Sequence, residues 1–441
     1  MSIVYRKLVA VGIASLLLAM RALATGFLIH DGDRVVFLGA SITEQRLYTT
    51  YIEAYTLARY PAWKLTFRNV GWGGDTSWLR QRAHPDEGNL FAAAEAPQQA
   101  MVEDAVKRGL ERDVLPLRPT VVMINFGMND HSYQPFREDI FRAYVRSQAQ
   151  LAKVLEGAGA RVAFLTPQPI EEKRSDPDQD VRNQSLRRFS DGLKEVAARE
   201  GALFVDEFAP YMSLMLRERA ANPSAIIGGG DAVHPGPPGH TLMAWAILKG
   251  LGAPAAVSRA EIAAPAGTVV AAENCAISNV KVADSGLTFD RLDEALPMPV
   301  DARAEAALKL APVLDDLSRY ELRVTGLVPG NYEVKIDGES VARVSHDKLA
   351  EGLNLSDLPG PVTKQCSTVL NLVFQKNDVF FRRWRDVQLY NLPSWAENPA
   401  SADGRAAELA KLDQQIVEFE SQIDAARKPV LRRFEIKQVA Q

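Results

Sequence analysis

Ser41 is the first residue of the sequence whose surroundings indicate chemistry. It comes just after residues 35–39, a continuous run of valine, phenylalanine and leucine that ends in a glycine. Such a run is typical of a buried strand in a parallel sheet, and open α/β sheets bind their ligands at the carboxyl ends of the strands. We therefore predict that Ser41 is a nucleophile at that edge of a sheet.

The sequence also offers a base for this serine. A serine hydroxyl is a weak nucleophile until a base removes its proton, and a carboxylate commonly orients that base. Asp231 and His234 lie three positions apart on a predicted tight turn after the glycines at 228–230. Asp231 can accept the Nδ1 proton of His234 and leave Nε2 free to face Ser41. We expect His240, on the following helix, to be structural. No comparable arrangement surrounds the remaining histidines, which are His30, His84, His131 and His346.

Two further loops can supply hydrogen-bond donors. The glycine-rich loop at residues 71–76 follows the second predicted strand, and Asn129 lies in the loop after the third. Glycine lets a backbone N–H approach a substrate closely, and the amide of Asn129 can face a developing oxyanion. With the N–H of Ser41 these groups would form a three-donor oxyanion hole. Asp75 and Asp130 are interpreted as carboxylates that brace the loops rather than as the acid pair of a glycosidase.

In this order, the four stretches resemble the conserved blocks of the SGNH (GDSL-like) hydrolase family, over roughly residues 30–250. The resemblance implies a nucleophile at Ser41, a base at His234 and an orienting acid at Asp231. It also implies that Gly74 and Asn129 join Ser41 as oxyanion donors. Gly74 is chosen from the glycine loop because it directly precedes Asp-Thr, as the corresponding glycine of the family often does.

The sequence departs from the family pattern at the nucleophile. The Gly-Asp-Ser-Leu of the family reads here as Gly39-Ala40-Ser41-Ile42, which keeps the serine and puts in doubt a hydrogen bond from the missing aspartate. Thr43 stands where the Gly-x-Ser-x-Gly elbow of the α/β-hydrolases has its second glycine, which argues against that other fold.

Alternating strands and helices position these residues. Apolar runs predict five strands, at 34–39, 64–70, 120–126, 161–166 and 202–206. Amphipathic segments between and after them predict helices around 48–60, 98–112, 136–156, 180–200 and 237–250. This alternation indicates parallel βαβ units. We therefore expect a three-layer α/β/α sandwich with a five-stranded parallel sheet, of the flavodoxin-like SGNH type.

The composition changes after residue 252. Alanine and proline dominate 253–266, as in a linker, and alternating segments at 319–325, 331–336 and 340–345 then predict a small antiparallel β unit. A helix is expected over 362–389, followed by a last helix that ends before Pro429. We divide the chain into a signal peptide (1–24), a hydrolase domain (25–252), a β-rich accessory region (253–360) and a helical C-terminal region (361–441).

The C-terminal helices carry two apolar patterns. The last helix has a short heptad seam, which we expect to pack on the body of the protein rather than to form a dimer; its residues are Leu409, Leu412, Ile416, Phe419 and Ile423. The helix before it carries aromatic residues that suggest either a sugar-binding surface or, the interpretation we favour, a core: Phe380, Phe381, Trp384 and Tyr390. The sequence leaves the oligomeric state open.

The N-terminus has the pattern of a secretory signal peptide. Arg6 and Lys7 precede an apolar run at 8–20 that is too short to span a bilayer comfortably, and an Ala-Leu-Ala cleavage site follows at 22–24. We expect an exported protein, periplasmic or secreted, that is not inserted in a membrane after cleavage. Export would allow Cys275 and Cys366 to pair; two buried free thiols are the alternative.

Taken together, the sequence predicts an exported serine esterase that acts through an acyl-enzyme and deacetylates O-acetylated carbohydrate. A net charge of −4 without a basic run gives no sign of nucleic-acid binding, and no metal or cofactor motif is present. Two alternatives stay open: an acyltransferase or lipase/thioesterase-like enzyme of the same family, and an inactive glycan-binding or structural protein on the same scaffold.

Overall fold

The computed structural model describes residues 26–173, 176–390 and 396–439, and its first domain is built on a five-stranded parallel sheet. The strand order is β2-β1-β3-β4-β5. The strands are β1 (Arg34–Gly39), β2 (Thr66–Asn69), β3 (Val121–Asn125), β4 (Arg161–Leu165) and β5 (Leu203–Val205). Each lies inside a predicted strand, so the predicted parallel sheet is confirmed. The signal peptide prediction lies outside the described residues.

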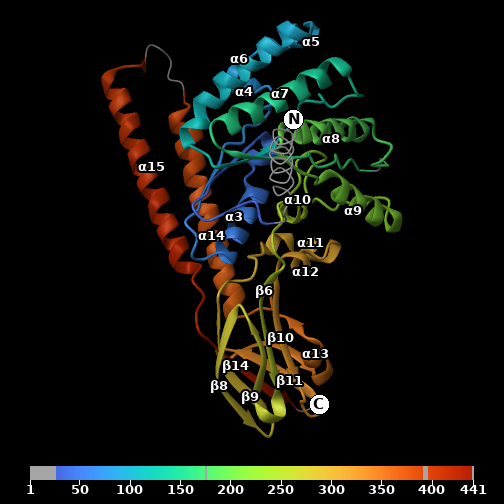
Figure 1. The fold of residues 1–441 in the computed structure, drawn as a ribbon, viewed down its shortest axis with the longest axis vertical. Coiled ribbons are helices and arrows are strands. Elements are labelled where there is room, and N and C mark those ends of the chain that lie inside the picture. Colours follow the sequence, from blue (N-terminus) through green and yellow to red (C-terminus); the bar gives the residue numbers. More distant parts are fainter. Residues whose placement is uncertain (1–25, 174–175, 391–395, 440–441) are drawn as a thin grey trace, which may run out of the picture.

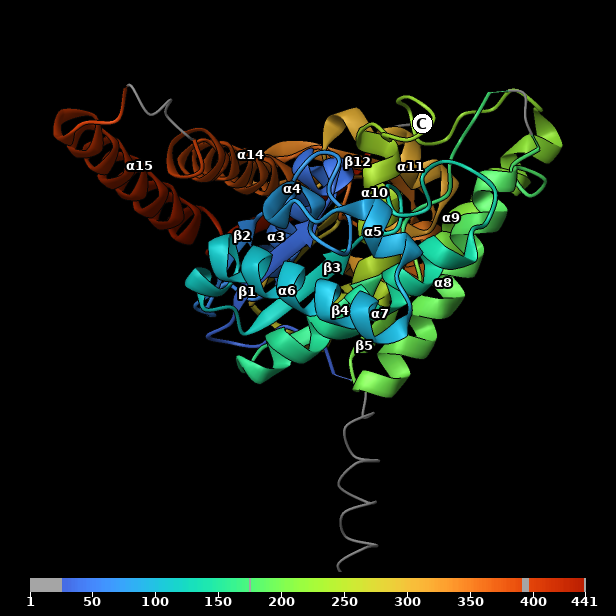
Figure 2. The same ribbon diagram turned by 90° about the horizontal axis from the view of Figure 1, so that it is seen from above.

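Side chains alternate between the two faces of this sheet, and each face has its own apolar layer. Val35 and Phe37 of β1 pack in one layer, whereas Val36 and Leu38 pack in the other. The first layer contains α3 (Leu47–Arg59), α9 (Phe208–Ala221) and α10 (Pro237–Gly250). The second contains α6 (Glu95–Asp113), α7 (Glu138–Gly157) and α8 (Val181–Glu200). The sheet thus lies between two helical layers (Figure 2), as expected for a three-layer sandwich.

The accessory region contains two sheets below the α/β domain in Figure 1, rather than one small unit. One has the order β13-β10-β6-β7, and the other β12-β11-β14-β9-β8. The strands predicted around 319–345 are present as β10 (Arg319–Thr325), β11 (Asn331–Ile336) and β12 (Glu339–Ser345). The others are β6 (Ala256–Ala263), β7 (Thr268–Glu273), β8 (Cys275–Ala283), β9 (Gly286–Asp293), β13 (Leu353–Asn354) and β14 (Arg432–Val439).

Two of these strands correct the sequence analysis. Residues 253–266 are not a linker, because β6 pairs parallel with β10 and antiparallel with β7 and buries Val257, Ala260 and Ile262. Residues 361–441 are not wholly helical, because β14 inserts between β9 and β11. The C-terminal segment therefore returns to the accessory region and completes its second sheet. The domain boundaries themselves stay a prediction.

The C-terminal helices run alongside the rest of the molecule (Figure 1). α14 (Pro361–Phe381) contacts α3 and β2 of the α/β domain and continues in a π-helical turn, Arg382–Gln388. α15 (Pro399–Ala426) packs on α14. Leu412, Ile416 and Ile423 of the predicted seam are buried, so the seam packs on the protein's own body as expected. Phe380 and Trp384 are buried as core residues, whereas Tyr390 is exposed.

Short elements complete the fold. The helices are α2 (Ser41–Glu44), α4 (Arg80–Ala83), α5 (Glu87–Ala92), α11 (Glu305–Leu310), α12 (Val313–Leu317) and α13 (His346–Glu351), with 3-10 turns at Leu115–Leu117, Ala264–Ala266 and Ala302–Ala304. Cys275 and Cys366 are free thiols, so the alternative without a disulfide holds. Within the described ranges, no helix combines the length and the apolarity that crossing a membrane requires.

A buried ion pair joins α14 to the α/β domain. The ammonium of Lys376 contacts the carboxylate of Glu53 on α3, and the two side chains are 1% and 3% exposed. Asn377 Nδ2 donates to Glu53 Oε2 and to Thr50 Oγ1, each at 3.0 Å. Burial raises the pKa of Glu53 and lowers that of Lys376, because both lose hydration. The pair therefore fixes where α14 lies on α3.

We expect Lys376→Met to destabilise the protein by about 3–5 kcal/mol, because it leaves the Glu53 carboxylate buried without its cation. Urea unfolding followed by tryptophan fluorescence measures the change. The double variant Lys376→Met/Glu53→Leu should recover most of the loss. Lys364→Met removes an exposed ion pair between the same helix, α14, and Glu339 of β12, and it should cost less than about 1 kcal/mol. Equal stability of Lys376→Met and Lys364→Met would contradict the anchoring role.

Candidate active site

The three residues predicted to form a catalytic triad lie together in the structure. Ser41 is the first residue of α2, directly after β1, and its Oγ lies 2.9 Å from Nε2 of His234. Nδ1 of His234 lies 3.1 Å from Oδ2 of Asp231. The serine and the histidine are 193 positions apart in the sequence. The fold thus joins the end of the first strand to the loop before α10.

The turn that carries Asp231 and His234 is held by the aspartate itself. Oδ1 of Asp231 accepts the backbone N–H groups of Val233 at 2.8 Å and His234 at 2.7 Å. These bonds, with the His234 side chain, hold the pKa of Asp231 below its ordinary value. Asp231 is therefore a carboxylate at neutral pH and can accept a hydrogen bond from an N–H at Nδ1 of His234. That assignment leaves Nε2 as the acceptor for the hydroxyl of Ser41.

A buried carboxylate, Glu171, holds the loop at residues 227–236 that carries Asp231 and His234. Glu171 was not identified from the sequence. Glu171 accepts the N–H groups of Ile227 at 2.7 Å and Gly228 at 2.8 Å, and its own N–H donates to Ala232 at 2.8 Å. Burial raises the pKa of Glu171. The glycines of the loop are required by close packing, since a Cβ on Gly236 would lie 1.7 Å from the backbone oxygen of Gly229. The loop that carries His234 is thus held by the hydrogen bonds of Glu171 and by the close packing of its own glycines.

The glycine loop passes beside Ser41. A Cβ built on Gly73 would lie 3.9 Å from Cβ of Ser41, and the N–H of Gly73 donates to Oε2 of Glu44 at 3.0 Å. Gly74 has φ +77°, a conformation that favours glycine. Among the described residues, none accepts a hydrogen bond from the N–H of Gly74 or Ser41. Both N–H groups are therefore free to bind an oxyanion.

The side chain of Asn129 is oriented by two partners. Its Nδ2 donates to the backbone oxygen of Asp75 at 2.9 Å, and its Oδ1 accepts the hydroxyl of Tyr133 at 2.9 Å. One N–H of the amide remains for a further acceptor. Tyr133 itself has φ +56° and is 40% exposed, and strained residues of this kind cluster at functional sites. Nothing in the sequence pattern singled out Tyr133, because its partner is defined only by the folded loop.

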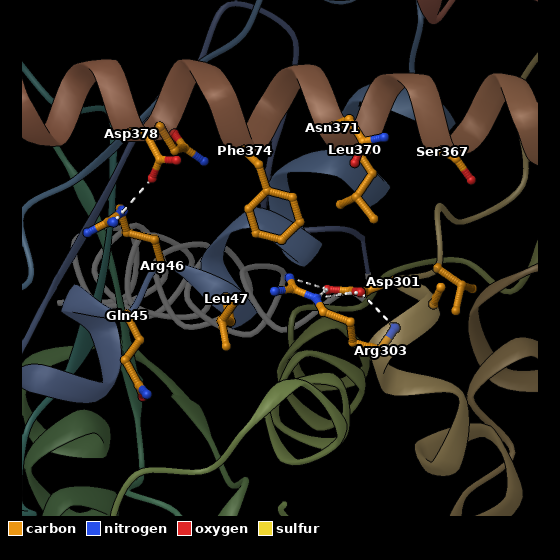
Figure 3. Close-up of a pocket in the computed structure, with 13 residues that line it drawn as sticks. Gln45, Arg46, Leu47, Asp301, Arg303, Ser367, Leu370, Asn371, Phe374 and Asp378 are labelled. Atoms are coloured by element: carbon orange, nitrogen blue, oxygen red, sulfur yellow. Dashed lines mark hydrogen bonds and ion pairs between the residues drawn. The ribbon is translucent and has the colours of Figure 1, made fainter. Parts of the chain in front are cut away.

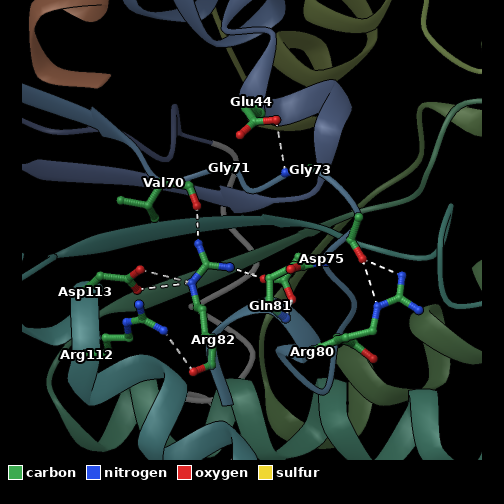
Figure 4. A network of polar contacts seen from close by, with 12 residues as sticks. Glu44, Val70, Gly71, Gly73, Asp75, Arg80, Gln81, Arg82, Arg112 and Asp113 are labelled. Atoms are coloured by element: carbon green, nitrogen blue, oxygen red, sulfur yellow. Dashed lines mark hydrogen bonds and ion pairs between the residues drawn. The ribbon is translucent and has the colours of Figure 1, made fainter. Parts of the chain in front are cut away.

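The carboxylates next to the site brace the loops, as the sequence indicates. Asp75 pairs with Arg82, whose guanidinium also bonds to Asp113 and to the backbone oxygen of Val70 (Figure 4). Asp130 accepts the N–H groups of Ser77 at 2.9 Å and Gly127 at 3.0 Å. Burial raises the pKa of Asp130 to about 6. Both carboxylates are therefore occupied by structural partners.

The glycine before the nucleophile and the alanine beside it have packing roles. A Cβ on Gly39 would lie 2.7 Å from the backbone oxygen of Asn125, so β1 and β3 approach closely only because this residue is glycine. Ala40, which replaces the aspartate of the family motif, is buried in the second apolar layer. No hydrogen bond can come from its side chain.

The C-terminal region packs on the glycine loop at residues 71–76. This contact was not predicted from the sequence. The guanidinium of Arg385, in the π-helical turn, lies 3.5 Å from the ring centroid of Trp72, and Trp384 packs edge-on against that ring at 6.0 Å. Trp72 precedes Gly73 in the glycine loop. The π-helical turn therefore packs on the glycine loop through Trp72. This contact joins residues about 300 positions apart.

His240 is structural, as expected. Its Nδ1 accepts the N–H of Tyr48 at 3.2 Å, and its Nε2 lies 3.0 Å from Oε1 of Gln45. Burial lowers the pKa of His240 to about 3. It is therefore a neutral imidazole that donates to Gln45.

Part of the chain is similar to known proteins. Residues 37–242 match the GDSL-like lipase/acylhydrolase family. An acetylxylan esterase of Geobacillus stearothermophilus is 25% identical over 248 residues, which are 51% of this chain and 96% of that protein. A crystal structure of an acetylxylan esterase from the same organism is 23% identical, covers 51% of this chain and 96% of its own, and has a TM-score of 0.39.

A second solved structure is similar over nearly the whole chain. It is a gut microbial diltiazem-metabolizing enzyme, 27% identical, with a TM-score of 0.77. The match covers 94% of this chain and 99% of that one, so it includes the accessory sheets and the C-terminal helices. Over residues 37–242, the α/β domain of this protein is therefore similar to the GDSL-like lipase/acylhydrolase family, the SGNH hydrolases.

Proposed function

We propose that this protein is an exported serine esterase that removes acetyl groups from O-acetylated carbohydrate. The observation that carries the catalytic part is the chain of hydrogen bonds from Ser41 through His234 to Asp231. The similarity of residues 37–242 to a family of lipases and acylhydrolases supports the reaction class. The similarity to an acetylxylan esterase supports the acetylated glycan, and the N-terminal pattern at residues 1–24 supports export.

In the first half-reaction, Oγ of Ser41 attacks the carbonyl carbon of the ester and its proton passes to Nε2 of His234. Asp231 stabilises the imidazolium that forms. The negative charge on the carbonyl oxygen is bound by the N–H groups of Ser41 and Gly74 and by Nδ2 of Asn129. The bond to the sugar oxygen then breaks as His234 returns the proton to that oxygen. An acetyl group remains on Ser41.

In the second half-reaction, a water molecule takes the place of the sugar. His234 accepts a proton from the water as its oxygen attacks the acetyl carbon, and the same three donors bind the second oxyanion. The bond to Oγ of Ser41 breaks, and His234 returns the proton to the serine. Acetate leaves and the enzyme is restored. The positions of Glu171 and Arg82 matter here because a base and donors that stay fixed need no rearrangement during reaction.

We expect Ser41→Ala to abolish ester hydrolysis while the protein stays folded, because the variant lacks only the nucleophilic oxygen. Acetate release is measured from p-nitrophenyl acetate, acetylated xylan, acetylated pectin and diltiazem. Circular dichroism and thermal unfolding control for folding. If the wild type and the variant release acetate from every substrate at one background rate, the esterase proposal is wrong.

Replacing Asp231 with Asn should lower kcat by about 10²- to 10⁴-fold with little change in KM, because an amide cannot stabilise the imidazolium or hold the same tautomer. Steady-state kinetics on p-nitrophenyl acetate separate the two constants. Asp284→Asn, on an exposed turn of the accessory region, is the matched control. An unchanged kcat in Asp231→Asn would exclude the assigned acid.

The proposed oxyanion role of Asn129 predicts a large loss of kcat when its amide is removed and a smaller loss when Tyr133 is changed. Asn129→Ala should lower kcat by about 10²- to 10³-fold, because it removes one donor to the transition state. Tyr133→Phe should have a smaller effect, since the backbone oxygen of Asp75 still holds the amide. Pre-steady-state acylation of the enzyme by p-nitrophenyl acetate measures both. A larger loss in Tyr133→Phe than in Asn129→Ala would contradict the assignment.

A further inference from the structure

A cavity of about 530 Å³ lies where the α/β domain, the accessory region and α14 meet. Its walls are the turn at residues 45–47 after α2, the loop at 300–303 and one face of α14 (Figure 3). Ligand pockets commonly have volumes of about 300–1,000 Å³ and occur at the interfaces of domains. Neither the catalytic residues nor the family motifs account for this cavity.

The cavity begins one helical turn beyond the nucleophile. α2 is a single turn that starts at Ser41, and the N–H of Gln45 donates to the backbone oxygen of Ser41 at 2.9 Å. Four residues of helix rise by about 6 Å. A ligand with its ester group at Ser41 must extend by about this length to enter the cavity, so a small ester cannot fill both.

The charged groups of the cavity are paired with one another. Arg46 Nη2 lies 3.1 Å from Oδ1 of Asp378, and Arg303 Nη2 lies 2.7 Å from Oδ2 of Asp301. The two cations and two anions balance, so the cavity has no net charge to attract an ionic ligand. This balance favours a neutral ligand that exchanges hydrogen bonds with the wall.

The remaining wall residues match a neutral polyhydroxylated ligand. Gln45 and Asn371 are exposed amides, and Oε1 of Gln45 is occupied by His240, which leaves its amino group to donate to a ligand. Phe374 is half-buried, packs edge-on against Tyr51 at 6.2 Å and points into the cavity (Figure 3). The guanidinium of Arg303 lies 5.5 Å from the ring centroid of Phe374. Amide groups and an aromatic ring in the wall of one cavity provide partners for the hydroxyl groups and the apolar face of a sugar.

The backbone at the edge of the cavity is held in an uncommon conformation. Arg46 has φ +61°, which few residues other than glycine adopt. Its Nη1 donates to the backbone oxygen of Glu44 at 2.8 Å, and its guanidinium lies 4.2 Å from the ring centroid of Phe381. Strained residues are retained where they position functional groups. Here the conformation directs Arg46 toward Asp378 and Phe381 of α14 (Figure 3).

We infer that this cavity is a glycan subsite, which holds the sugar units next to the one whose acetyl group reacts at Ser41. The inference rests on the proposed function and names its substrate as a carbohydrate chain rather than a single acetylated sugar. α14 then contributes directly to substrate choice, through Asn371 and Phe374.

The test fills the cavity without touching the triad. Asn371→Trp places an indole in the cavity from an exposed position of α14, and Thr368→Trp places the same group on an exposed position of that helix outside the cavity. For Asn371→Trp, kcat/KM on acetylated xylo-oligosaccharides should fall at least about tenfold through a higher KM. Its kcat/KM on p-nitrophenyl acetate should stay within about twofold of wild type. Thr368→Trp should resemble wild type on both substrates.

The outcomes separate this inference from the function on which it rests. Unchanged kinetics of Asn371→Trp on the oligosaccharides would overturn the subsite, as would an equal loss on both substrates. A wild type that cleaves p-nitrophenyl acetate but no acetylated oligosaccharide would overturn the carbohydrate function, and the subsite with it. As a direct measurement, Ser41→Ala should bind an acetylated xylo-oligosaccharide in calorimetry, and Ser41→Ala/Asn371→Trp should bind it at least about tenfold more weakly.

Discussion

The hydrogen bond between Ser41 and His234 is the constraint on which the rest of the site depends. Its two residues come from opposite ends of the α/β domain, so a distance of 2.9 Å requires both loops to be placed accurately. The sheet places the serine at the end of β1, and α10 places the histidine loop. Glu171 fixes that loop through the N–H groups of Ile227 and Gly228. The geometry of the proposed triad is thus a property of the whole domain.

The residues of the proposed triad and the ion pairs that support the neighbouring loops differ in burial. The side chains of His234 and Asp231 are 37% and 67% exposed, whereas Arg82 and Asp75 are fully buried. Exposure lets a substrate and water reach the triad, and burial makes the supporting ion pairs costly to break. The fully buried ion pairs therefore lie in the residues that support the loops, and the side chains of His234 and Asp231 in the proposed triad stay exposed to solvent. Arg385 and Trp384 extend this support from the C-terminal region to the glycine loop.

Local patterns were sufficient to predict the parallel sheet and the proximity of Ser41, His234 and Asp231. The five strands are buried apolar runs, and Asp231 and His234 share one turn, so both signals lie within short windows. β6 was missed because its alanines and neighbouring prolines resemble a linker, although Val257 and Ile262 are buried. β14 was missed because its partners lie far away in the sequence. The same holds for Tyr133, Glu171 and Arg385, whose roles depend on contacts that only the folded chain creates.

The position of β14 has a consequence for the order in which the protein can form. This strand lies in the middle of the second accessory sheet, and its Arg433 bonds to Asp290, 143 residues earlier. During synthesis the α/β domain can complete its sheet long before residues 432–439 exist, because domains made first generally fold first. The accessory sheet meanwhile exposes the edges of β9 and β11, which can pair with other chains. A chaperone that covers these two edges until the last strand arrives would protect the newly made protein at its most vulnerable stage.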